Sequence, residues 1–150
     1  MPSTTRLAVI GLLAASPALL AACGSSDDSA HGQTVTVALG EWSFTPSTDD
    51  IKAGEITFVA ENEGSLTHEL VLFKTDLEPS TLPVDEDGAV DERGAGLQLI
   101  DEVEDVEKGA TKQFTVTLEP GKYVMACNVV EDGVQHFMKQ MYKAFEVTEA

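Results

Sequence analysis

The stretch that decides the fold and chemistry of this chain is KYVMACNVVEDGVQHFMKQM, from Lys122 to Met141. Its first six residues, which are apolar after Lys122, are typical of a buried strand, and a second strand pattern begins at Met141. Cys127 ends the first strand pattern, and His136 lies on the loop between the two. A thiol, an imidazole and a thioether on one such loop can converge on a single point.

Alternating apolar and polar residues predict further strands in the rest of the chain. Val35, Val37 and Leu39 share one face of a run whose other face carries threonines, which is the period of a half-buried strand. The same reasoning gives the full set of expected strands: 34–39, 55–60, 68–74, 113–118, 122–127 and 141–148. No segment shows convincing helical spacing, so an all-β, antiparallel β-sandwich is predicted.

A second histidine completes a set of metal ligands. His68 begins a predicted strand far from the loop in sequence, and a sandwich could bring its imidazole to the same end as Cys127, His136 and Met141. Soft sulfur with imidazole nitrogen suits copper, and two His, one Cys and a weak axial Met form the blue-copper arrangement. Zinc is more often held by four strong ligands, and thioether is a poor one for it.

The order of these residues resembles the cupredoxins. The resemblance covers roughly residues 33–148 and rests on several segments: Glu41–Pro46, Ile51–Gly54, Asn62–Gly64, His68–Leu70, Pro120–Asn128 and His136–Met141. It implies a Greek-key sandwich of 33–150 holding one Cu(I)/Cu(II) ion. The chain departs from the family's pattern at three places: the Cys-to-His gap is long, Gln140 replaces a frequent Gly, and Glu69 replaces a frequent Asn. The longer loop also allows Met138 to compete with Met141 as the axial ligand.

The resemblance implies a monomeric electron carrier rather than an enzyme. In the family, electrons usually pass through the exposed edge of the loop histidine, here His136, and Val134 and Phe137 are expected to form an apolar docking patch with Met138. Three alternatives remain open. They are a copper-trafficking or storage protein with the same ligands, a metal-free module of the same fold, and a catalytic red-copper variant in which Met141 does not bind.

The first 32 residues have the composition of a targeting segment and a tether rather than of a folded domain. Leu7–Ala22 is an apolar run of 16 residues, too short to cross a membrane and typical of an export signal. Leu20–Gly24 (LAACG) resembles the lipobox of bacterial lipoproteins, which implies cleavage after residue 22 and a lipid on Cys23. A plain secretory signal that contains a cysteine is the alternative. Residues 23–32, with a solvated His31, are then a flexible tether beside the membrane, outside the cytoplasm.

The net charge limits the possible partners. The chain has 26 acidic and 9 basic residues and a formal charge of -17, which excludes nucleic-acid binding. Residues 76–107 hold twelve acids and one base, and we expect an exposed connection there, with short strands around 97–100 or 103–106. They lack a complete calcium-loop pattern. The expected partner is a basic or neutral redox protein, such as a cytochrome or an oxidase, steered by this acidic segment.

Overall fold

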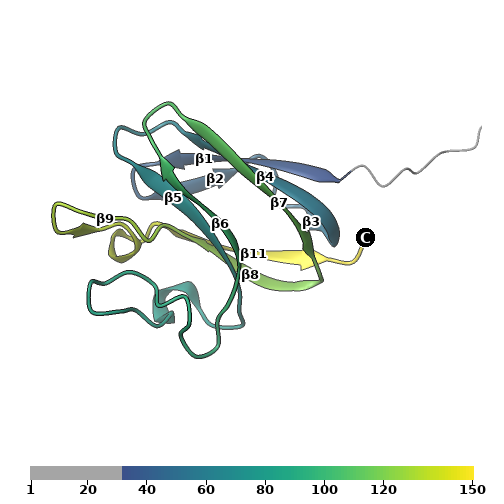
Figure 1. The fold of residues 1–150 in the computed structure, drawn as a ribbon. Coiled ribbons are helices and arrows are strands. Elements are labelled where there is room, and N and C mark those ends of the chain that lie inside the picture. Colours follow the sequence, from purple (N-terminus) through teal and green to yellow (C-terminus); the bar gives the residue numbers. More distant parts are fainter. Residues whose placement is uncertain (1–31) are drawn as a thin grey trace, which may run out of the picture.

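Two β-sheets stack face to face in the computed structural model, which describes residues 32–150 (Figure 1). The first sheet consists of β2 (Ser43–Pro46), β1 (Gln33–Gly40), β4 (Gly54–Asn62) and β7 (Thr111–Leu118), in that order. The second consists of β3 (Ile51–Lys52), β11 (Tyr142–Thr148), β8 (Gly121–Ala126), β5 (His68–Lys74) and β6 (Gln98–Val106). The predicted all-β sandwich is therefore confirmed.

The remaining elements are short. β9 (Val130–Glu131) and β10 (Val134–Gln135) form a small hairpin, and η1 (Pro79–Thr81) and η2 (Phe137–Lys139) are single 3-10 turns. Over residues 32–150, no helix has the length and apolar character needed to cross a membrane.

The predicted antiparallel pairing holds for most strands but not for all of them. β1 pairs with β4 in parallel, and β11 pairs with β3 in parallel. The cause is the path of the chain, because after the β1–β2 hairpin it crosses to the second sheet as β3 and then returns as β4. A parallel pair requires such a crossover, and alternation along each strand carries no information about it.

The alternating residues of the first sheet fill the space between the layers. Val35, Val37 and Leu39 of β1 are completely buried, as are Ile56 and Phe58 of β4. Burial of these side chains is the main force holding the two sheets together. Each Å² of apolar surface removed from water stabilises the folded state by about 25 cal/mol.

The acidic segment of residues 76–107 is mostly exposed, as expected, but a few of its side chains are buried. Leu82 and Val90 are buried and pack with Val71 and Phe73, so the segment covers the outer face of β5. The short strands expected around 97–100 or 103–106 form one strand of nine residues, β6, with two irregularities in its pairing. Strand β5 is consequently buried on both faces, which explains its nearly continuous apolar sequence.

Candidate metal centre

Three donor side chains from different parts of the chain meet at one end of the sandwich. His68 is the first residue of β5, and Cys127 directly follows the last residue of β8. β5 and β8 are antiparallel neighbours, so the start of one strand lies beside the end of the other. His136 directly precedes η2 in the segment that leads back to β11. All three side chains have 0% exposure.

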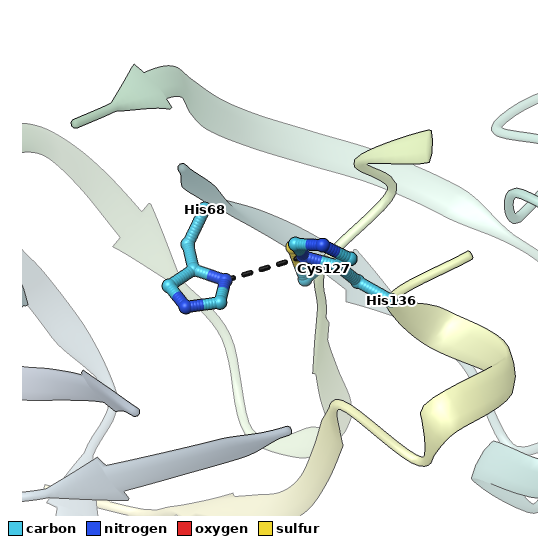
Figure 2. A group of neighbouring side chains, drawn as sticks. All are labelled: His68, Cys127 and His136. Carbon is cyan, nitrogen blue, oxygen red and sulfur yellow. Dashed lines mark hydrogen bonds between the residues drawn. The ribbon is translucent and has the colours of Figure 1, made fainter. Parts of the chain in front are cut away.

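The distances between the donors suit a single metal ion. His136 Nδ1 lies 3.2 Å from His68 Nδ1 and 3.4 Å from Cys127 Sγ (Figure 2). All three donor atoms lie within 4.8 Å of one another, and residues 32–150 contain no other such group of His, Cys, Asp or Glu. First-row metals bind nitrogen and sulfur at about 2.0–2.3 Å, which places neighbouring donors about 3.2–3.5 Å apart at tetrahedral angles. The residues present therefore fit one ion.

Burial keeps the metal-free donors uncharged. It lowers the pKa of both imidazoles, and for His136 the neighbouring His68 adds to the effect. Burial also raises the pKa of the Cys127 thiol to about 12. The Nε2 atoms of both histidines are buried without a hydrogen-bond partner. Buried polar atoms rarely remain unpaired in proteins, and they often mark a functional site.

The backbone of Met141 is hydrogen-bonded to two of the residues that carry the donors. Its N–H donates to the His136 carbonyl at 3.2 Å, and its carbonyl accepts from Cys127 N–H at 3.1 Å. The side chain is fully buried in the main core, whereas Met138 is 59% exposed on η2. Gln140 has a left-handed φ of 68°, so the tight turn before Met141 forms without the frequent glycine.

The long gap between Cys127 and His136 is taken up by a hairpin. β9 and β10 are joined by Asp132 and Gly133, whose φ angles of 50° and 76° suit a tight two-residue hairpin turn. His136 N–H donates to the Val129 carbonyl at 3.0 Å, which closes the base of this loop. The additional residues project as a hairpin, and His136 still reaches the other donors.

The predicted docking patch is wrong in two respects. His136 has no exposed edge, and Phe137 is buried against Tyr142 with a ring distance of 5.3 Å. Val134 is half-buried. Trp42 instead lies edge-on to His136, with ring centroids 4.9 Å apart. The covering of His136 depends on this tertiary contact, so spacing along the loop could not reveal it.

Two acidic residues next to the donors also lacked a role in the sequence analysis. Glu69, beside His68, accepts a hydrogen bond of 2.5 Å from the backbone N–H of Asn128, beside Cys127. This bond ties β5 to the residue after the cysteine, and burial raises the pKa of Glu69 to about 7 although the bond opposes that shift. Glu41 lies on the β1–β2 turn, and its Oε1 is 3.8 Å from His68 Nε2.

The amino-terminal predictions concern residues outside the part that the structure describes. They are the signal peptide of 1–22, the tether of 23–32 except for Gly32, the lipidated Cys23 and the solvated His31. All of them stay predictions.

Over residues 32–150, an all-β sandwich with a buried His-Cys-His cluster at one end defines a domain that could hold one metal ion. The sequence matches the model of the cupredoxin-like domain over residues 12–137, and the chain belongs to this family. A comparison with curated proteins finds no match.

Two solved structures illustrate the likeness of the fold. Dithionite-reduced auracyanin from the photosynthetic bacterium Roseiflexus castenholzii has a TM-score of 0.55 and 20% identity, covering 77% of this chain and 97% of its own. Auracyanin B has a TM-score of 0.51 and 17% identity, covering 77% of this chain and 88% of its own. At these identities the likeness concerns the fold alone.

Proposed function

We propose that this protein is an electron carrier with one type 1 copper ion held by His68, Cys127, His136 and Met141. The observation that carries the proposal is the buried group of one sulfur and two imidazole nitrogens, all within 4.8 Å of one another, with two separations of 3.2 and 3.4 Å that fit one ion. This combination of soft and borderline donors favours copper over harder metals. Copper in such a site supplies one-electron transfer between Cu(I) and Cu(II).

The chain's own residues supply rigidity and exclude water. His68 and Cys127 belong to the ends of paired strands, and backbone hydrogen bonds fix Cys127 to Met141 and His136 to Val129. Donors held in this way move little when the charge of the site changes, which favours fast electron exchange. Their complete burial also keeps substrates away, which supports a carrier rather than an enzyme.

The proposal includes the location and the partner. The chain is tethered to the bacterial membrane, outside the cytoplasm, by a lipid on Cys23. It exchanges electrons as a monomer with a basic or neutral redox protein. The lipobox-like LAACG sequence supports the anchor, and the charge of -17 supports the basic partner.

The visible and electron paramagnetic resonance spectra of the purified protein with one equivalent of Cu(II) test the copper site. We expect an intense blue or green absorption that disappears in Cys127→Ser, while Met138→Leu leaves the spectrum unchanged. Met141→Leu should keep the colour but alter the spectrum, because the weak axial ligand is lost. A colourless wild-type protein after loading would refute the proposal.

A copper-trafficking or storage protein with the same ligands is the alternative. It requires fast metal exchange, which the complete burial of the three donors disfavours. Reversible reduction and oxidation with slow loss of copper to a soluble chelator supports the carrier. Rapid exchange of Cu(I) without redox turnover supports trafficking instead.

A further inference from the structure

The turn between β1 and β2 brings a carboxylate to the outer side of one donor. Gly40 pairs with Ser43, so Glu41 and Trp42 are the two residues of a tight hairpin loop. Trp42 has a left-handed φ of 67°, which bulky residues rarely adopt. This turn sets the indole against His136 and the Glu41 carboxylate next to His68 Nε2.

Backbone hydrogen bonds hold the Glu41 carboxylate in this place. Its Oε1 accepts from the N–H groups of Ser65 and Leu66, the latter at 3.1 Å, and contacts the Ser65 hydroxyl at 3.2 Å. An exposed glutamate that accepts hydrogen bonds from two backbone N–H groups carries its ordinary negative charge at neutral pH. The Glu41 carboxylate is therefore anchored by Ser65 and Leu66 to the loop that precedes His68.

The absence of a side chain at Gly64 leaves room for this contact. A Cβ at that position would collide with the Glu41 carboxylate and would lie 3.1 Å from His68 Nε2. The glycine therefore allows the loop, the carboxylate and the imidazole to approach one another closely.

We propose that Glu41 is a positioning residue for His68, and that its charge places the ring proton on Nε2 and leaves the Nδ1 lone pair for the metal. His68 Nδ1 faces His136 and Cys127 (Figure 2). Its Nε2 lies 3.8 Å from Glu41 Oε1 and has no hydrogen-bond partner. A neutral imidazole carries one proton, and an adjacent negative charge favours the tautomer whose N–H points at it. A partner on the outer nitrogen also makes a ligating histidine a stronger donor.

This inference rests on the proposed function for its copper readout, but its first test uses the metal-free protein. Nitrogen-15 NMR of the imidazoles should show His68 protonated at Nε2 in the wild type. Glu41→Gln keeps an oxygen acceptor for the loop but removes the charge, and should shift His68 towards the Nδ1–H form. Gly64→Ala should have the same effect by displacing the carboxylate.

The second test is the affinity for Cu(II). Glu41→Gln should weaken it about tenfold, as is common for residues that orient a ligating histidine. If Cu(I) affinity is unchanged, this corresponds to a rise of about 59 mV in the one-electron reduction potential. The matched control is Glu63→Gln, an exposed residue of the same loop that removes the same charge away from His68.

The outcomes separate this inference from the proposed function. Two results would overturn the role of Glu41. One is a wild type in which His68 is protonated at Nδ1. The other is an equal effect of Glu41→Gln and Glu63→Gln on the tautomer and on the Cu(II) affinity. A wild type that binds no copper would refute the proposed function, whereas the NMR result on the metal-free chain would still decide which nitrogen carries the proton.

Discussion

The indole of Trp42 covers the imidazole of His136, and this contact determines how the site meets solvent. The two rings lie edge-on at an interplanar angle of 86°, and His136 has no exposed surface. The left-handed backbone at Trp42 costs on the order of 1–3 kcal/mol for a residue other than glycine. Such strain persists only where surrounding contacts enforce it, and it is often found at functional sites.

Truncation of this side chain should make the copper easier to remove. Trp42→Ala exposes His136 to water, and we expect a soluble chelator to remove copper about tenfold faster, because the apolar surroundings of a metal site control solvent access. The rate is measured as loss of the visible absorption. Trp42→Phe keeps an aromatic cover and should stay close to the wild type. Equal rates for all three proteins would show that the indole does not protect the site.

The loop between β4 and β5 owes its shape to one buried side chain at the end of β4. The Nδ2 of Asn62 donates to the carbonyls of Leu66 and Val106, both at 2.7 Å, and its Oδ1 accepts from Gly64 N–H at 2.9 Å. These three bonds connect the end of β4 to the loop that leads into His68 and to the end of β6. Asn62 thus links the core to the position of the first histidine.

Replacement of Asn62 should destabilise the protein substantially. Asn62→Leu keeps the branched shape of the side chain but leaves the carbonyls of Leu66 and Val106 without this donor, at a cost of about 3 kcal/mol in the free energy of unfolding. Urea unfolding of the metal-free protein measures this change. The adjacent exposed Glu63→Ala should change the stability by less than about 0.5 kcal/mol. A variant at position 62 as stable as this control would contradict the assigned role.

Acidic side chains gather over β6 and give the whole molecule a dependence on pH. Burial raises the pKa of Glu102 above its ordinary value of 4.5, and Glu92, Glu104 and Asp101 raise it further. The folded state therefore binds this proton more tightly than the unfolded state does. Its stabilising contribution is complete below pH 4.5 and is lost as the pH rises through the raised value.

Glu102→Gln should remove this part of the pH dependence. The variant should gain on the order of 0.5 kcal/mol relative to the wild type as the pH rises from about 4.5 to 8, since a half-buried surface charge contributes modestly. Unfolding of the metal-free protein by urea at several pH values measures it. Glu149→Gln, near the carboxyl terminus, is the matched control. If the free energy of unfolding depends on pH in the same way in both variants, a specific effect of Glu102 is excluded.

The net charge of -17 predicts how the proposed carrier meets its partner. Opposite charges accelerate encounter, and salt screens them over about 10 Å at 0.1 M. Electron transfer to a basic cytochrome should therefore slow about tenfold or more between low and high ionic strength. An acidic cytochrome should show the opposite trend. A rate to the basic partner that does not depend on salt would refute electrostatic steering.

Local patterns were sufficient to predict the layers of the fold and the residues that meet at the site. The faces of β1 and β4 follow from alternation, because each side chain's direction in a strand is set by its position along the chain. The few cysteines and histidines likewise limited the candidate donors to His68, Cys127 and His136, and the structure brings these three together.

Only the tertiary structure decided which strands run in parallel, which segment covers β5, and what surrounds the donors. Residue periodicity specifies a face but not the neighbour that packs on it, and the buried Phe137 and the covered His136 depend on such neighbours. Glu41 and His68 are 27 positions apart, and Trp42 and His136 are 94 apart. Contacts over these separations arise from the path of the whole backbone, so no local pattern specifies them.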